Sequence, residues 1–409
     1  MFFGLFKPRV RKVYLPILEW LPDEVLIEIV RSAPKGNQAA LCRTSKPFYA
    51  LSLPILYQNV VLYLGEKTDI IDTFCLTVVG HPERADVIRS LRFKNVGYIR
   101  YTWCLKSLNY DLFFESLKRM NNLEHLSFDD DTTSPEDFSS RLASMTFPRL
   151  RHLAIYHPTS DSGRAQVARI FSLHRDLTHV ALWSLCPDSD EPEYIKWDNT
   201  VVLQNLRHYE GHSTALLDAC CTTRTLRAAR IRAISWPTPR SIFATLQSRT
   251  SRDQNLPFTL SIDYMLKNDE LQSMLVSLSG DMPQIRCLQM RSYEDKMHIV
   301  GPQVFSAFIR ANPFMQTTVQ TFAENLRRFG RIQYFALNYR AHYEYELGSV
   351  WNAKRCHKAV KMFAEACPTL RACCIGSRAW KKVIMDAPWV EYTRDAFEVD
   401  AGLSEFEDR

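Results

Sequence analysis

Glycine is scarce in this chain, at 13 of 409 residues. The glycine-rich loops that cradle phosphates, G-x-G-x-x-G and G-x-x-x-x-G-K, are both absent. The G-x-S-x-G motif of many hydrolases and the H-E-x-x-H motif of metalloproteases are absent too. These absences argue against the common nucleotide-binding, hydrolase and metalloprotease classes. We therefore expect a protein without catalytic residues and without a cofactor.

The sequence also lacks a convincing membrane span and a secretory segment. One uncharged stretch, residues 47–65, contains two prolines together with Gln58 and Asn59. We expect it to form a helix, a break and a strand that starts at Asn59, and not to cross a membrane. The N-terminus places its apolar residues before its basic ones, which is the reverse of a signal peptide. Residues 1–14 are expected to be a flexible basic lead-in.

No C-x-x-C motif occurs among the 11 cysteines, which are scattered singly or as adjacent pairs. An odd number of cysteines without a secretory segment indicates reduced thiols, as expected in the cytoplasm or nucleus. The nearest approach to a metal cluster is the group Cys356, His357, Cys367, Cys373 and Cys374. Its spacing matches no usual zinc pattern, so we expect buried structural thiols and no metal.

The charge is mildly basic, with a net value of +6. Residues 391–409 carry seven acidic and two basic side chains, so the rest of the chain has a net charge of +11. We expect residues 391–409 to be an acidic C-terminal tail, with a last strand or a cap of the solenoid near Trp389 and a solvated end. No basic helix and no alternation of aromatic and basic residues is present, so a nucleic-acid partner is not expected.

What the sequence does contain, starting near residue 15, is a run of three short helical patterns. The residues Leu21-Pro22-Asp23-Glu24 are typical of a helix start, because proline needs no hydrogen-bond partner there and the carboxylates favour the helix dipole. A second helix is predicted near residues 37–43. A third is predicted to start at Ser45 as its N-cap and to stop at Pro54.

Three blocks of this region, in order and at the right spacing, resemble an F-box of the type that opens many fungal F-box/leucine-rich-repeat proteins. They are LPDEVLIEIV from Leu21, LCRTSKPFYAL from Leu41, and PILY from Pro54. The resemblance covers residues 15–60 and implies docking on a Skp-type adaptor of a cullin–RING ubiquitin ligase. The contact residues that it implies are Leu21, Pro22, Val25, Leu26, Ile29, Leu41, Phe48 and Leu51. The alternative is a plain helical cap on the domain that follows.

A short pattern, apolar-x-x-apolar-x-apolar, then returns ten times along the chain. The ten hexapeptides start at Ile88, Leu123, Leu150, Leu177, Leu206, Leu226, Pro257, Ile285, Ile332 and Leu370. Amphipathic helical windows lie between them, and the usual separation is close to 27 residues. A strand followed by a helix at this period is the signature of a leucine-rich repeat.

The predicted fold is therefore α/β: an F-box followed over residues 61–390 by an irregular solenoid, with parallel strands on the concave side and helices outside. The 47-residue interval between Ile285 and Ile332 is expected to hold an extra helix that Pro313 breaks. An ordinary α/β domain is the main rival, although its glycine-rich turns are missing. With 46% apolar residues the chain has enough apolar side chains for a real core.

Strand alternation predicts which side chains line the concave face. Positions 4 and 6 of each hexapeptide point inward, whereas positions 3, 5 and 7 face the concave surface. Position 3 is histidine in four successive copies, which predicts a column of stacked rings. The expected concave residues are His125, His152, His179 and His208 at position 3, Arg230 at position 5, and Tyr156, Trp183, His212, Arg232 and Arg291 at position 7.

The histidine column permits two interpretations. In the first, the rings contact acidic or phosphorylated groups of a partner, or they weaken the binding of a partner as they become charged at mildly acid pH. Alternatively, Leu-x-His-Leu is a filler of the repeat without a specific role. Aromatic and arginine side chains on the concave wall are the residue types that dominate interface energetics, so this wall is the predicted target-binding surface.

The resemblance as a whole implies the substrate-recognition subunit of an SCF-type ubiquitin ligase, acting by proximity and not by chemistry. The competing class is a repeat-containing binding scaffold without a ligase. Exposure of Val25, Leu26 or neighbouring apolar side chains is expected for a docking F-box, whereas a cap would bury them. The sequence does not identify the target protein.

Overall fold

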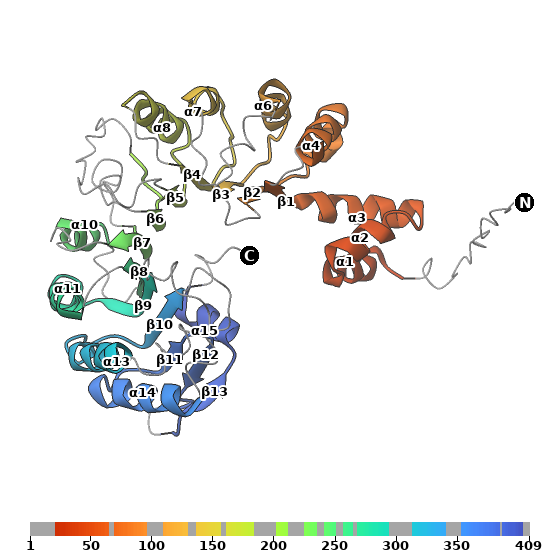
Figure 1. Cartoon of the computed structure of the whole chain (residues 1–409). Helices are drawn as coiled ribbons and strands as arrows, with labels where there is room; N and C mark the ends of the chain where they lie inside the picture. Colours follow the sequence, from red (N-terminus) through yellow and green to blue (C-terminus); the bar gives the residue numbers. More distant parts are fainter. Residues whose placement is uncertain are drawn as a thin grey trace, which may run out of the picture.

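The structure is a computed structural model. It describes residues 21–64, 69–95, 109–129, 136–156, 161–183, 202–211, 225–234, 241–250, 257–264, 268–293, 313–340, 353–384 and 387–403. These residues form one 13-stranded sheet that curves into an open arc, with helices along its outer side (Figure 1). The fold is an α/β solenoid, as predicted.

The strands follow one another in the sheet in sequence order, from β1 to β13. Strands β1 to β11 pair in parallel, and β12 and β13 close the sheet in antiparallel fashion. Their bounds are β1 Asn59–Leu64, β2 Ser90–Asn95, β3 His125–Asp129, β4 His152–Tyr156, β5 His179–Trp183, β6 His208–Gly211, β7 Ala228–Ile234, β8 Phe258–Tyr264, β9 Ile285–Tyr293, β10 Tyr334–Arg340, β11 Ala372–Ile375, β12 Arg378–Lys381 and β13 Val390–Tyr392.

The outer layer of helices alternates with the strands along the chain (Figure 1). Its members are α4 Asp69–Gly80, α5 Pro82–Ala85, α6 Tyr110–Lys118, α7 Glu136–Leu142, α8 Asp161–Leu173, α10 Ser241–Arg249, α11 Asn268–Asp281, α13 Pro313–Leu326 and α14 Ala353–Ala366. Pro313 begins α13 and does not break it, because a proline in the first turn loses no helical hydrogen bond. This part of the prediction was wrong.

Each of the ten hexapeptides lies on one strand, from β2 to β11. Their apolar positions point between the sheet and the outer helices, where Leu126, Leu153 and Val180 are all at most 2% exposed. The resulting core is continuous from Leu62 on β1 to Trp380 on β12. Each repeat thus buries its apolar face against its neighbours, as a solenoid requires.

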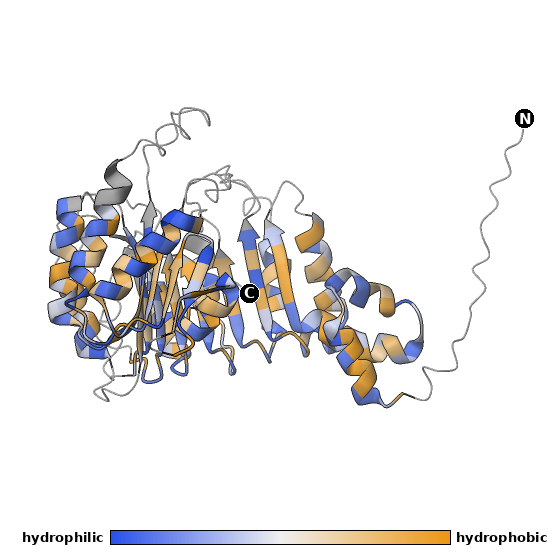
Figure 2. Ribbon diagram, turned by 90° about the horizontal axis from the view of Figure 1, so that it is seen from below, coloured by the Kyte–Doolittle hydropathy of each residue, from blue (hydrophilic) through white to orange (hydrophobic). Residues whose placement is uncertain are grey.

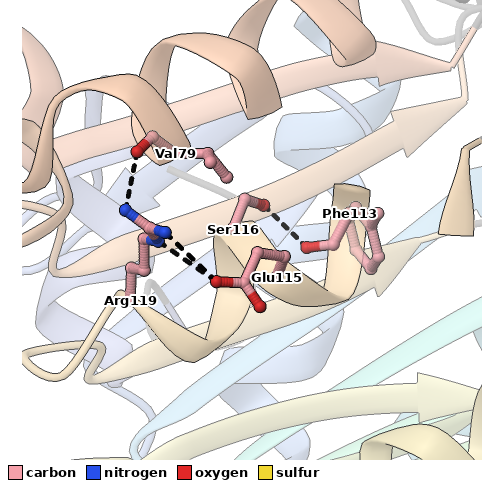
Figure 3. A network of polar contacts seen from close by, with 5 residues as sticks. All are labelled: Val79, Phe113, Glu115, Ser116 and Arg119. Atoms are coloured by element: carbon pink, nitrogen blue, oxygen red, sulfur yellow. Dashed lines mark hydrogen bonds and ion pairs between the residues drawn. The ribbon is translucent and has the colours of Figure 1, made fainter. Parts of the chain in front are cut away.

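Polar contacts also join neighbouring repeats. Arg119, at the C-terminal end of α6, donates to the carbonyl oxygen of Val79 at 2.7 Å (Figure 3). The same guanidinium pairs with Glu115 at 3.2 Å. The last turn of α4 has carbonyl groups without helical partners, so this contact satisfies one of them and fixes α6 beside α4.

A unit of three helices precedes the sheet: α1 Asp23–Ser32, α2 Lys35–Leu41 and α3 Lys46–Gln58 (Figure 1). The Ser45 hydroxyl accepts a hydrogen bond from the Phe48 backbone amide at 3.3 Å, which is the predicted N-cap. Pro54 lies inside α3, so the predicted stop there is wrong. The helix runs on to Gln58 and leads directly into β1.

The last part of the chain does not form a solvated tail throughout. After β13, helix α15 Arg394–Ala401 folds back onto the concave side of the sheet (Figure 1). Phe397 and Leu403 are fully buried there, among concave-facing residues that include Ala228, Cys287 and Cys374. The expected tail over residues 391–409 is corrected for residues 391–403, because these apolar side chains cover the C-terminal part of the concave face.

Candidate functional site

The three-helix unit has a small core of its own and an apolar face outside it. Leu26, Val30 and Phe48 form the core, at 5% exposed or less. Val25 and Ile29 lie one helical turn apart on the other side of α1 and are 42% and 43% exposed. Of the other predicted adaptor contacts, Pro22 is exposed, whereas Leu21, Leu41 and Leu51 pack partly against the core.

The attachment of this unit leaves α1 uncovered. Helices α1 and α2 pack on α3, and α3 alone continues into the sheet through β1. The Arg84 side chain of α5 contacts the Tyr49 hydroxyl at 3.4 Å and lies over the Tyr57 ring, so the solenoid holds α3. The outward side of α1 therefore presents Val25 and Ile29 to solvent, while Leu26 and Phe48 stabilise the unit itself.

The predicted histidine column is present on the concave face of β3 to β6. The strand register places His125, His152, His179 and His208 side by side. Successive ring centroids are 3.8, 3.6 and 3.9 Å apart. His208 is buried and the other three rings are partly exposed, and the column runs across the first residues of these four strands.

Electrostatics within the column disfavour charge. Burial, together with the neighbouring rings of His179 and His125, lowers the pKa of His152 to about 2. Burial and the nearby Arg92 guanidinium lower the pKa of His125 as well. Both rings are uncharged at neutral pH. They offer stacking and hydrogen bonds to a partner and do not attract carboxylate or phosphate groups as cations.

Mild acid is expected to destabilise the fold through His152. The unfolded chain takes up a proton on this histidine below about pH 6.5, whereas the folded chain does not. The contribution of His152 to the free energy of unfolding is therefore fully present above pH 6.5 and is lost as the pH falls, by about 1 to 1.5 kcal/mol at pH 5.5.

Thermal unfolding at pH 7.5 and 5.5 will measure this loss of stability. The variant His152→Phe should show a smaller pH effect than the wild type, and the exposed-site control His81→Gln the same effect as the wild type. Equal pH effects in all three proteins would refute this prediction.

Beside the column, charged side chains on the concave face are paired within the chain. Arg230 on β7 is 4% exposed and lies 2.8 Å from a carboxylate oxygen of Glu210 and 3.6 Å from one of Asp263. Arg291 on β9 is 9% exposed and lies next to Asp263 in the register. Arg230 and Arg291 are thus held inside the structure and are not displayed to a partner as the sequence suggested.

The remaining predicted concave residues are placed only in part. Tyr156 and Trp183 are register partners on β4 and β5, and Arg232 lies on β7. The side chains of these three residues, and the whole of His212, lie outside the described part of the structure. Among the concave side chains that the structure describes, the most exposed lie near the N-terminal edge of the sheet, where Tyr63 on β1 is 58% exposed.

The covering of the C-terminal concave face by α15 was missed from the sequence. The Thr393 hydroxyl caps α15 by accepting a hydrogen bond from the Ala396 amide at 3.2 Å. Thr393 together with the apolar pair Phe397 and Ala401, four residues apart, is a helix signal that the acidic composition of this segment obscured. Within the described residues, α15 thus covers the C-terminal part of the concave face and leaves its N-terminal part uncovered.

No metal centre emerges from the described residues. They contain no group of three or more His, Cys, Asp or Glu side chains arranged to hold a metal ion. Cys356, Cys367, Cys373 and Cys374 are buried free thiols, and burial raises the pKa of each of the first three. Within the same residues, no helix is both long and apolar enough to span a membrane.

A scan against protein-family models finds no match for this chain, and a search of curated proteins finds no relative.

Proposed function

We propose that this protein is the substrate-recognition subunit of an SCF-type ubiquitin ligase. The three-helix unit docks on a Skp-type adaptor, and the solenoid holds the target protein. The observation that carries the proposal is the exposed apolar pair Val25 and Ile29 on α1, in a segment whose sequence resembles an F-box. Exposed apolar side chains on an otherwise folded unit are typical of a protein-binding surface.

The arrangement of the unit supports this function. Because only α3 is joined to the sheet, α1 and α2 extend beyond the end of the arc, where an adaptor has access to them (Figure 1). A helical cap would instead turn its apolar face toward the solenoid. On this proposal the protein raises the rate of ubiquitin transfer by holding its target near the conjugating enzyme.

The test is co-purification with a Skp-type adaptor. We expect a stoichiometric complex with the wild type and a loss of about a hundredfold or more in affinity for the variant Val25→Glu/Ile29→Glu, since two charges are placed in an apolar interface. Both residues are exposed, so the variant should stay folded. A substitution at the buried Leu26 is unsuitable because it would unfold the unit.

A matched control uses α4, where Ile70 and Leu76 are 58% and 60% exposed. The variant Ile70→Glu/Leu76→Glu should bind the adaptor like the wild type. If well-folded wild-type protein forms no complex, the ligase proposal fails and a binding scaffold without a ligase is the better description. If both variants lose binding equally, the surface on α1 is not the docking site.

A further inference from the structure

A row of basic side chains follows one edge of the solenoid, which we call the strand-entry rim. It consists of the turns that run from the last residue of each outer helix to the second position of the next hexapeptide. In Figure 2 the strands point upward from these turns, which lie along the lower edge of the sheet. The second hexapeptide position is arginine in six of the ten copies: Arg89, Arg151, Arg207, Arg227, Arg286 and Arg371.

Backbone hydrogen bonds hold these positions in line. The amide of Arg151 donates to the Glu124 carbonyl, and the amide of Arg227 donates to the Arg207 carbonyl, both at 2.8 Å. Neighbouring strands are about 4.8 Å apart, so arginines two strands apart are separated by about 9.6 Å. The side chains therefore form a regular row along the rim.

The rim is far more basic than the rest of the chain. Among its described residues, the exposed acidic side chains are only Asp86 and Asp176. Ten basic side chains are exposed there: Lys118, Arg149, Arg151, Arg175, Arg207, Arg227, Arg327, Arg328, Arg331 and Arg371. The excess of eight positive charges is larger than the net charge of +6 of the whole chain.

Helix dipoles explain only part of this excess. Outer helices end at the rim, and basic residues near a helix C-terminus offset its partial negative charge of about half a unit. Seven such helices (α6, α7, α8, α10, α11, α13 and α14) account for about 3.5 units. Roughly half of the positive charge is left over, and the arginines at the second hexapeptide position lie several residues beyond the helix ends.

Internal pairing neutralises only part of the row. Arg89 pairs with Glu124 at 3.4 Å and Arg151 with Asp176 at 3.6 Å, and Arg286 donates to the side-chain oxygen of Gln333 at 2.8 Å. By contrast, Arg207, Arg227 and Arg371 form no hydrogen bond or ion pair through their side chains with any other described residue. These guanidinium groups are available to a partner.

We propose that the strand-entry rim is a docking surface for an acidic, extended segment of a partner protein. Guanidinium groups bind carboxylates in a planar, two-point geometry. In an extended chain of the polyproline II type, with three residues per turn, every third side chain lies on the same side and about 9.3 Å along, which matches arginines two strands apart. No aromatic side chain is exposed in the described turns of the rim, so the base-stacking platform of single-strand nucleic-acid binding is missing there. The inference does not depend on the ligase proposal.

The test is the fluorescence anisotropy of a labelled glutamate-rich peptide of about 15 residues, at about 0.15 M salt. The variant Arg207→Glu/Arg227→Glu reverses two exposed, adjacent charges of the rim. We expect it to weaken peptide binding about tenfold or more. The control Lys358→Glu/Lys361→Glu makes the same charge change on the exposed side of α14 and should change affinity by less than about twofold.

Three results would overturn the proposal. They are no peptide binding by the wild type at this salt concentration, equal weakening in the rim variant and the control, and tighter binding of a nucleic-acid duplex than of the peptide. The last result would assign the rim to phosphate backbones instead. Since adaptor binding does not enter the assay, failure here leaves the proposed function untouched.

Discussion

The substitution Phe397→Ala is expected to lower the free energy of unfolding by about 3 to 5 kcal/mol. Phe397 is fully buried, and it joins α15 to the concave side of the sheet, where its ring packs edge-on with the rings of Tyr334 and Tyr392 at 6.3 and 6.4 Å between centroids. Removing the ring leaves a cavity between α15 and the strands that these neighbours do not fill. Denaturant unfolding, followed by circular dichroism, will measure the loss.

The same helix provides a matched control for this prediction. Val399 lies two residues further along α15 and is 59% exposed. The substitution Val399→Ala should change stability by less than about 0.5 kcal/mol. If Phe397→Ala were as mild as the control, α15 would not be an integral part of the concave face.

Replacing Arg230 by methionine is expected to cost about 3 to 5 kcal/mol. The guanidinium lies between Glu210 and Asp263, which are 8% and 0% exposed. Without it, two carboxylates are left in a buried place without their cation, and their desolvation is no longer offset. Thermal unfolding of the variant will test this, with the exposed Arg227→Met as a control that should be nearly neutral.

A triple variant distinguishes the effect of the buried charges from the effect of side-chain packing. Replacing Arg230, Glu210 and Asp263 together by apolar residues of similar volume removes the buried charges along with their partner. We expect it to be more stable than Arg230→Met alone. A triple variant that is less stable than the single one would mean that shape, and not charge, governs this part of the face.

The solenoid was predictable because its pattern is local. Six-residue segments with apolar residues at positions 1, 4 and 6 determine which side of a strand is buried. The strand register then follows, because equivalent positions of neighbouring hexapeptides pair with one another. The histidine column came from the same reasoning, since one position of the hexapeptide repeats in line. A local pattern of this kind needs no knowledge of distant residues.

The features that were missed depend on contacts between distant segments. Adjacent apolar residues such as Val25 and Leu26 differ in exposure only because α3 packs on one side of α1, which short helices do not reveal. The burial of Arg230 depends on Glu210 and Asp263, each on a different strand. The cluster in which Phe397, Ala401 and Leu403 are buried includes residues from β7 to β12, and the acidic composition of the tail gave no sign of this packing.

The return of α15 has a consequence for the order of folding. The Thr259 hydroxyl donates to the Ala401 carbonyl at 3.2 Å across 142 residues of sequence, whereas the strands pair with their nearest neighbours along the chain. Local pairing forms early, and a contact of high sequence separation pays a larger loop-closure entropy. The solenoid is therefore expected to assemble repeat by repeat during synthesis, with α15 docking last. Until then its inner face stays open, and a nascent chain has a concave surface that the finished protein lacks.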